Sequence, residues 1–210
     1  MIAATLVERF LVGCFWLSPY KWADAVLARL EAARRGRGAD WEAVRRVRYA
    51  VSEAYITLWL VAAVALWFGA ALVPVWVAWL ALLRVFGILA KELGVILFGK
   101  CKITEGHMVA ASGRAIVLAL VNYATAGFLF GFVYARLGRF AVGDRPAASL
   151  DTPDALVQAL TIHFSLGPAY TPADTASWAL VVGQMGFAFL FSVIVISLFI
   201  SLLNIGAKRV

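Results

Sequence analysis

The sequence has few charged residues and almost no cysteine or histidine. Of its 210 residues, 15% are charged and 63% are hydrophobic, with two cysteines and two histidines. A soluble domain rarely has so apolar a composition, so we predict a multi-pass membrane protein. Cys14 and Cys101 are far apart in the sequence and match neither a disulfide framework nor a metal-ligand spacing.

Signatures of catalysis are also missing. The sequence contains no HExxH, GxSxG or P-loop pattern, and too few acidic residues lie inside apolar runs to form an intramembrane carboxylate pair. Cys101 and His107 share one basic segment, but two candidate ligands without a second pair do not make a metal site. We therefore predict that the protein is not an enzyme and uses no cofactor or metal.

The charges that are present are unevenly distributed. Residues 1–50 carry nine Lys/Arg against five Asp/Glu, and residues 84–114 carry five against two. The segment 136–154 has three of each sign, and the chain ends near Lys208 and Arg209. Basic segments remain in the cytoplasm, so we predict a plasma or inner membrane protein with both termini cytoplasmic. The basic segments are expected to contact anionic lipids, and no nucleic-acid partner is expected.

A charge-free run from Ala54 to Leu83 continues as a hydrophobic segment to Phe98. As one helix this segment would be about 67 Å long, roughly twice the thickness of the hydrocarbon core. The chain must therefore fold back, and Pro74 marks the turn. This predicts a first pair of transmembrane helices at 53–98. Arg84 is expected to form a structural ion pair or to extend towards the interface.

Two further apolar stretches follow. Residues 115–135 hold no charge and place Gly127 and Gly131 in a GxxxG arrangement, which lets two helices approach closely. Residues 175–207 also hold no charge. With the first pair, these stretches predict four transmembrane helices, an even number that agrees with both termini lying on one side.

The first 52 residues have a different composition. The segment WADAVLARLEAARR mixes Ala and Leu with charges and predicts an amphipathic helix that ends near Gly36 and Gly38. Such a helix either lies at the membrane interface or bundles with copies of itself. We assign residues 1–52 to a cytoplasmic or interfacial helical segment and residues 99–113 to a cytoplasmic loop.

A half-length element precedes the last apolar stretch. Thr152 suits the N-cap, Pro153 the first helical position and Asp154 the first turn. The run ALVQALTIHFS then spans about 16 Å, half of a bilayer, before Gly167-Pro168. Irregular backbone after a half-helix cannot face lipid. The pattern favours a re-entrant pore helix and loop over an amphipathic helix on the outer surface followed by an ordinary loop.

The order of these elements resembles a known family. Three segments are similar to the pore domain of the tetrameric potassium-channel superfamily, of the bacterial type with two additional N-terminal spans: RAIVLALVNYATAGFLFGFVYARLG, DALVQALTIHFSLG and TPADTASWALVVGQMGFAFLFSVIVISLFISLL. The resemblance implies an all-α membrane protein with four transmembrane helices plus a re-entrant pore helix and loop between the third and fourth. It implies a homotetramer that conducts monovalent cations, K⁺ or Na⁺. The implied channel domain, 114–207, comprises an outer helix at 114–136, a pore helix at 153–165, a filter-like loop at 165–172 and an inner helix at 176–205.

The resemblance also implies where a selectivity filter lies. In the family the pore helix is followed by Val/Leu-Gly-Tyr-Gly-Asp, whose backbone carbonyls replace the water shell of the ion. The positions carried over to this chain are Ser165, Leu166, Gly167, Pro168, Ala169 and Tyr170. Pro168 lacks an N–H and Ala169 resists positive φ, so the filter is altered and weak potassium selectivity is expected. The proline also favours a second hypothesis, a non-conducting membrane scaffold or regulatory protein with a channel-like fold.

Polar and small residues mark the last helix. Ser197, Ser201 and Asn204 fall at i, i+4 and i+7, a stripe that either lines water or forms hydrogen bonds between helices. Gly183 and Gly186 either provide a gating hinge or allow close packing. In the half-length helix, His163 is expected to be a neutral packed group.

Overall fold

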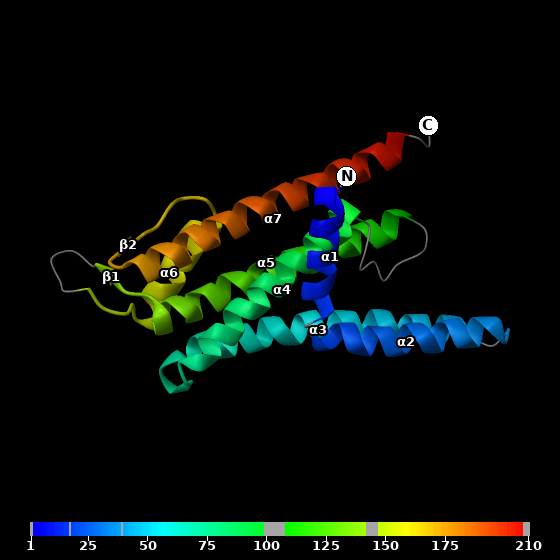
Figure 1. The fold of residues 1–210 in the computed structure, drawn as a ribbon, viewed down its shortest axis with the longest axis horizontal. Helices are drawn as coiled ribbons and strands as arrows, with labels where there is room; N and C mark the ends of the chain where they lie inside the picture. The colour runs from blue at the N-terminus through cyan, green and yellow to red at the C-terminus, as the bar shows by residue number, and fades with distance from the viewer. Residues whose placement is uncertain (1, 17, 39, 99–107, 142–146, 208–210) are drawn as a thin grey trace.

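The computed structural model is an elongated bundle of α-helices (Figure 1). It describes residues 2–16, 18–38, 40–98, 108–141 and 147–207. Its elements, in chain order, are α1 (Ile2–Trp16), α2 (Pro19–Gly36), α3 (Trp41–Phe68), the 3₁₀ turn η1 (Ala70–Leu72), α4 (Trp76–Phe98), α5 (Met108–Leu137), β1 (Phe140–Ala141), α6 (Thr152–His163), β2 (Thr171–Pro172) and α7 (Thr175–Ala207).

Three of the described helices, α3, α5 and α7, are long and apolar enough to cross a membrane. α5 lies at the centre of the bundle, because 61% of its apolar span is buried inside the chain, against 17% for α3 and 33% for α7. The outer helices expose large apolar side chains such as Leu58 of α3 and Val182 of α7. Exposed apolar surface of this extent suits contact with lipid. The protein is an all-α membrane protein.

α3 and α4 form a helical hairpin. The N–H of Gly69 donates to Ala65 O at 2.9 Å and ends α3, and α4 begins at Trp76. The predicted turn at Pro74 therefore lies between the two helices, where a residue without an N–H interrupts no helical hydrogen bond. α4 returns along the bundle and packs against α5 and α7.

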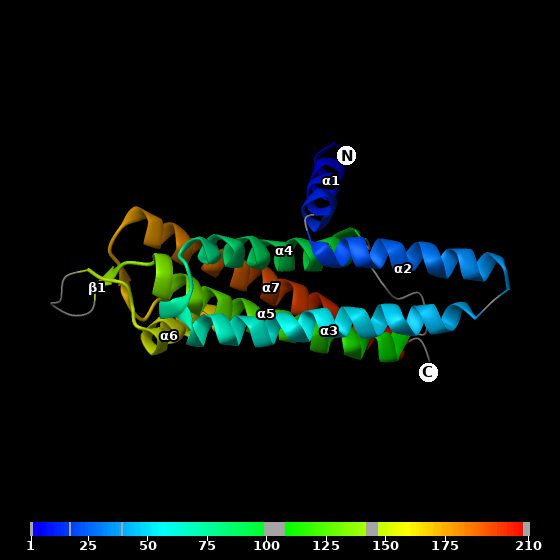
Figure 2. The same ribbon diagram turned by 90° about the horizontal axis from the view of Figure 1, so that it is seen from below.

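The amphipathic helix α2 packs antiparallel to the first half of α3 (Figure 2). Arg48 of α3 joins two carboxylates of α2, Asp24 at 2.8 Å and Glu31 at 2.5 Å. One face of α2 is thus held by its own chain. Its opposite face keeps exposed apolar side chains: Trp22, Val26 and Leu30.

α1 stands out from the bundle instead of running along it (Figure 2). It crosses α4, where Phe10 meets the edge of Phe86 with ring centroids 6.2 Å apart. Leu11 is buried, whereas Leu6 and Val7 are exposed. A helix that presents apolar side chains at right angles to the bundle suits the membrane interface.

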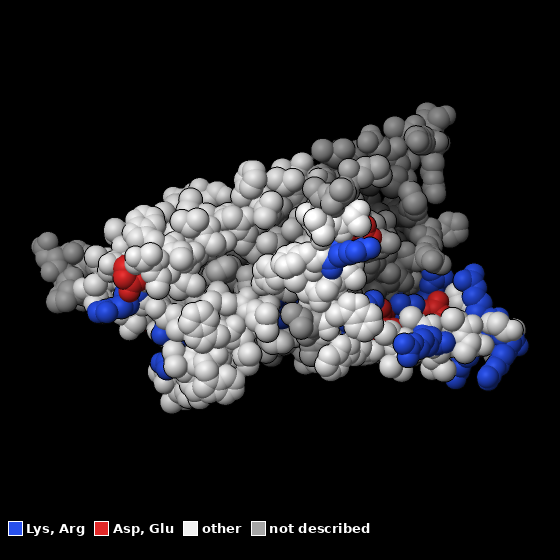
Figure 3. All heavy atoms as spheres, viewed as in Figure 1, with Lys and Arg blue, Asp and Glu red and all other residues white. Residues whose placement is uncertain are grey.

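Charged side chains concentrate at one end of the molecule. Figure 3 shows most of the visible Lys and Arg over α2 and the start of α3, while the middle of the visible face carries few charges. The separation follows the sequence, in which the long uncharged runs form the middle of the bundle. It matches the polarity profile of a membrane and its aqueous boundary.

Several element boundaries differ from those expected. α5 begins at Met108, inside the expected loop 99–113, of which residues 99–107 lie outside the described residues. The N-cap of α6 is Asp151, whose carboxylate accepts the N–H of Asp154 at 2.9 Å, and Thr152 is the first helical residue. Both residue types cap helices, so the sequence alone did not distinguish them. α6 ends at His163, two residues earlier than expected.

Candidate functional site

α6 packs along α5 at the two glycines of the GxxxG arrangement. Gly127 faces Leu160 and His163, and Gly131 faces Leu156. The contacts run in opposite chain directions, so the helices are antiparallel. A Cβ on Gly131 would lie 3.3 Å from Leu156 Cδ1 and 3.4 Å from its Cα, so a larger residue would push the helices apart.

α6 reaches only half-way along α5. At its start, Trp67 Nε1 from the end of α3 donates to Thr152 O at 2.8 Å. At its end, Tyr123 Oη from the middle of α5 donates to His163 O. The chain then returns through β2 to the end at which α6 began, and α7 starts there (Figure 1). β2 completes this return by pairing antiparallel with β1.

A buried polar network joins the end of α6 to α5 and α7. Gln184 Nε2 donates to Ala159 O at 2.8 Å and faces His163 Nδ1 at 3.4 Å. Tyr134 Oη donates to Gln184 Oε1 at 2.6 Å. His163 Nε2 lies 2.9 Å from Tyr123 O. A carbonyl only accepts, so Nε2 carries the proton, while Nδ1 faces an amide donor. The ring is therefore neutral and packed.

The segment after α6 changes abruptly from satisfied to unsatisfied backbone. The carbonyls of residues 160–162 accept N–H groups from residues 164–166, and His163 O accepts Tyr123 Oη. From Phe164 to Ala169, by contrast, no carbonyl accepts a hydrogen bond from any described residue. All residues of this segment are exposed, apart from the half-buried Gly167. We call residues 164–169 the re-entrant loop, because here the chain turns back towards the end at which α6 began.

Two residues of the re-entrant loop have left-handed backbone. Ser165 has φ of 60° and Gly167 has φ of 87°. Glycine adopts this conformation freely, whereas serine bears a steric cost of about 1 kcal/mol. Leu166, between them, is 77% exposed. An unfavourable conformation held at an exposed turn marks the loop as a candidate site.

Gln158 anchors the chain as it leaves the re-entrant loop. Its buried amide accepts the N–H of Tyr170 at 2.7 Å and donates to Tyr170 O at 3.3 Å. Tyr170 also packs against the hydrophobic core. Of the filter positions, Ser165, Leu166, Gly167, Pro168 and Ala169 share the re-entrant loop, whereas Tyr170 belongs to the anchored return.

Gln158 and Gln184 were not expected to be site residues. Each is a carboxamide with apolar neighbours in the sequence, and both are fully buried. That composition was the available signal, since a buried carboxamide needs partners on a neighbouring element. The identity of those partners depends on how α5, α6 and α7 pack.

The far end of the return carries a negative charge. Asp174 caps α7 by accepting the N–H of Ser177 at 2.7 Å, and this hydrogen bond lowers the pKa of Asp174 below its usual value. Ser177 Oγ in turn accepts the N–H of Arg139 at 2.8 Å. The carboxylate is thus held in its ionised form close to the start of α7.

On α7 the expected features lie apart from α6. Gly183 and Gly186 are exposed, and a Cβ on either would meet nothing within 4 Å, so they do not serve packing within one chain. Ser197 is exposed and donates to Val193 O at 2.8 Å. Ser201 and Asn204 belong to α7, but their side chains lie outside the described residues.

Among the described residues, no group of three or more His, Cys, Asp or Glu side chains could hold a metal ion. Cys101 and His107 fall in the range 99–107, outside the described residues. No protein-family model, curated protein or solved structure matches this chain.

Proposed function

We propose that the protein is a subunit of a homotetrameric, potassium-channel-like ion channel that conducts monovalent cations. The supporting observation is the re-entrant loop, which begins beside Tyr123 in the middle of α5 and whose six successive carbonyls accept no hydrogen bond from the described chain. The interior of a bilayer offers no water to such groups, so irregular backbone there must be buried in protein or line water. One chain supplies one loop, and four copies around an axis enclose a water-filled path.

The proposal counts α4 as a fourth membrane span. Its 23 residues make a helix of about 35 Å, enough to cross the hydrocarbon core. Its acidic residue Glu92 is buried, accepts Asn122 Nδ2 at 2.9 Å and lies 3.8 Å from Lys91. Four spans put both termini on one side, and the basic N-terminal segment assigns that side to the cytoplasm of a plasma or inner membrane.

Local electrostatics favour cations over anions. The C-terminal end of α6 points towards the re-entrant loop, and this end of a helix carries partial negative charge. His163 is neutral, residues 164–174 contain no Lys or Arg, and Asp174 is ionised. Pro168 and Ala169 do not form a regular row of carbonyl sites, so the preference for potassium is weak.

The inner wall of the proposed channel is α7. Ser197, Ser201 and Asn204 line its intracellular part, and Gly183 with Gly186 lets the helix bend during gating. The exposure of both glycines leaves this face of α7 available to neighbouring subunits.

Conduction is tested with the purified chain in liposomes. We expect K⁺ and Na⁺ flux with little difference between the two ions. Gly167→Val lowers the flux at least about tenfold, because valine resists the positive φ of that position. Gly13→Val is the matched control, since Gly13 is exposed and a Cβ there meets nothing within 4 Å. An intact tetramer that passes no ion at any voltage contradicts the proposal.

The second candidate function, a non-conducting scaffold, is favoured by Leu166. Its side chain is 77% exposed at the tip of the re-entrant loop, and four such leucines converging on one axis close the path. In this case the native chain is silent, and Leu166→Ala creates a flux. Leu72→Ala, at a position 90% exposed in the α3–α4 turn, serves as the control. Pro168-Ala169→Tyr-Gly shifts a conducting channel towards potassium and leaves a plugged one silent.

A further inference from the structure

An arginine that forms no salt bridge within the described residues lies between α1, α3 and α4. Arg84 of α4 extends its guanidinium over two rings of α3, 5.0 Å from the centroid of Tyr55 and 5.0 Å from that of Trp59. Its Nε is buried and has no hydrogen-bond partner among the described residues. The expected alternatives for Arg84 were an ion pair and an extended side chain, and no ion pair to it forms within the described chain.

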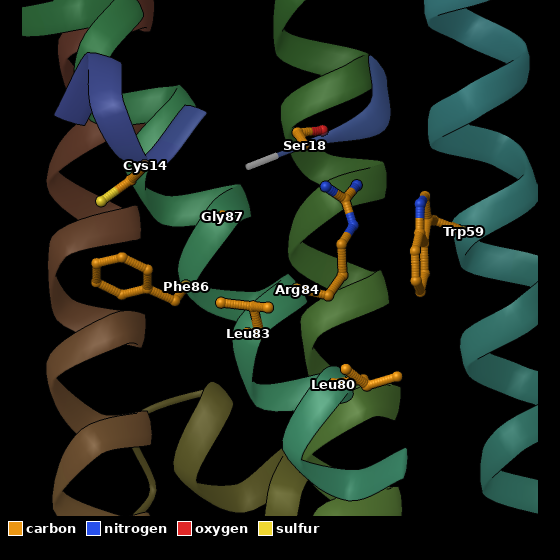
Figure 4. Close-up of a pocket in the computed structure, with 8 residues that line it drawn as sticks. All are labelled: Cys14, Ser18, Trp59, Leu80, Leu83, Arg84, Phe86 and Gly87. Atoms are coloured by element: carbon orange, nitrogen blue, oxygen red, sulfur yellow. The ribbon is translucent and has the colours of Figure 1, made fainter. Parts of the chain in front are cut away.

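The guanidinium borders a cavity with a volume of about 210 Å³. Its lining residues are Cys14, Ser18, Trp59, Leu80, Leu83, Arg84, Phe86 and Gly87. Figure 4 shows the guanidinium turned towards Ser18 and beside the Trp59 ring, with Leu83 and Phe86 on the other side. A single water needs only about 10–15 Å³, so the cavity has room for a larger group. Leu80, Leu83 and Phe86 are also exposed on the outer surface, which opens this wall towards lipid.

The surroundings of the cavity favour a negatively charged occupant. A second, smaller cavity of about 10 Å³ shares Ser18, Arg84 and Gly87 with the first and adds Lys91 to the lining. No Asp or Glu lines either cavity, so a headgroup ammonium finds no counter-charge in the lining; the carboxylate of Glu92 lies outside it, 3.8 Å from Lys91. Ser18 is the N-cap of α2. Its hydroxyl makes no capping bond and lies 3.2 Å from Tyr55 Oη, and the helix N-terminus adds partial positive charge.

We propose that this cavity binds the headgroup phosphate of an anionic phospholipid, with Arg84 as its main ligand and the acyl chains lying against Leu80, Leu83 and Phe86. A guanidinium binds phosphate through paired, charge-assisted hydrogen bonds. Basic pockets between transmembrane helices bind anionic headgroups in this way. α1 crosses α4 beside the cavity, and Cys14 of α1 lines it, so a bound lipid also fixes α1 against the bundle. The site is formed by one chain and does not depend on ion conduction.

The test is a lipid titration of the full-length chain in detergent, with the number of bound lipids read by native mass spectrometry. The probes are phosphatidylglycerol and phosphatidylcholine with identical acyl chains. We expect the native chain to prefer phosphatidylglycerol. Arg84→Gln weakens its binding at least about tenfold, since hydrogen bonds to charged groups are lost, and Arg84→Lys weakens it less. Arg139→Gln, at an exposed arginine outside the basic segments, leaves binding unchanged.

A second variant fills the cavity and keeps the charge. Gly87 lines the cavity and a Cβ there meets nothing within 4 Å, so Gly87→Leu fits the helix and occupies the space of the lipid. It is expected to abolish the preference, while Gly13→Leu, at an exposed glycine outside the lining, preserves it. Equal binding of both lipids by the native chain, or native-like binding by Arg84→Gln or Gly87→Leu, overturns the proposal. Competition by millimolar inorganic phosphate also overturns it, because the site would then be one for free phosphate.

Discussion

Two buried polar groups of this bundle have opposite surroundings. His163 on α6 has both ring nitrogens engaged, by Tyr123 O and by Gln184 Nε2. Arg84 on α4 has two aromatic rings and an unpartnered Nε. His163 lies on α6 and Arg84 on α4, and both of these helices pack against α5.

The comparison shows two uses of polarity inside a membrane protein. At His163, both ring nitrogens have hydrogen-bonding partners within the same chain. The network therefore fixes the position of α6 and leaves neither ring nitrogen available to a ligand. The guanidinium of Arg84 is left open beside a cavity, so it is available to a group from outside the chain. Unpaired buried polar atoms are rare in proteins, and each one requires a partner or a function.

The largest change in the free energy of unfolding is expected when the hydrogen bonds of Gln184 are removed. Gln184→Leu leaves Tyr134 Oη without its partner in a buried site and removes the hydrogen bond from Gln184 to Ala159 O. An orphaned buried group costs about 1–3 kcal/mol and a lost hydrogen bond about 1 kcal/mol more, so we expect the free energy of unfolding to fall by roughly 3 kcal/mol. The measurement is denaturant unfolding in mixed micelles followed by circular dichroism. A loss below about 1 kcal/mol would show that the network is not a main constraint on α6.

The next effect tests the packing that brings the network together. Gly131→Leu places a side chain against Leu156, whose Cα is 3.4 Å from the Cβ position, and is expected to destabilise the protein by about 1–3 kcal/mol. Gly13→Leu is the control, because Gly13 is exposed and a Cβ there meets nothing within 4 Å. Unfolding of both variants in detergent compares them directly. Equal losses at the two glycines would contradict the close approach of α5 and α6.

The smallest change in the free energy of unfolding is expected at Arg84. Arg84→Leu loses its contacts with the rings of Tyr55 and Trp59, but it also removes a guanidinium whose buried Nε has no hydrogen-bond partner among the described residues. The two terms oppose each other, so without anionic lipid the free energy of unfolding stays within about 1 kcal/mol of the native value. Added phosphatidylglycerol then stabilises the native chain more than the variant. A large loss in lipid-free detergent would place Arg84 with the closed structural network instead.

Part of this architecture could be predicted from particular residues. The uncharged runs predict the apolar helices, Pro74 predicts the α3–α4 turn, and the short run before Gly167-Pro168 predicts a helix of half length. These features depend on composition along the chain and on the length of a helix, which are local properties. The count of four spans and the passage of ions remain predictions.

Other features were beyond the reach of a linear pattern. The clamp of Gln158 on Tyr170, the partners of Gln184 and the missing partner of Arg84 each depend on side chains from different helices. The face of α2 that packs on α3 was equally open, since its apolar and charged positions fit a membrane surface or another helix.

The sequence by itself determined that this chain is a membrane protein made of apolar helices, because uncharged runs of this length are stable only in lipid or in a protein interior. It also determined where those helices are interrupted. Only the tertiary structure decided which buried polar groups are paired and which are not. A hydrogen bond depends on the distance and direction between groups from separate helices, and helix packing alone sets both.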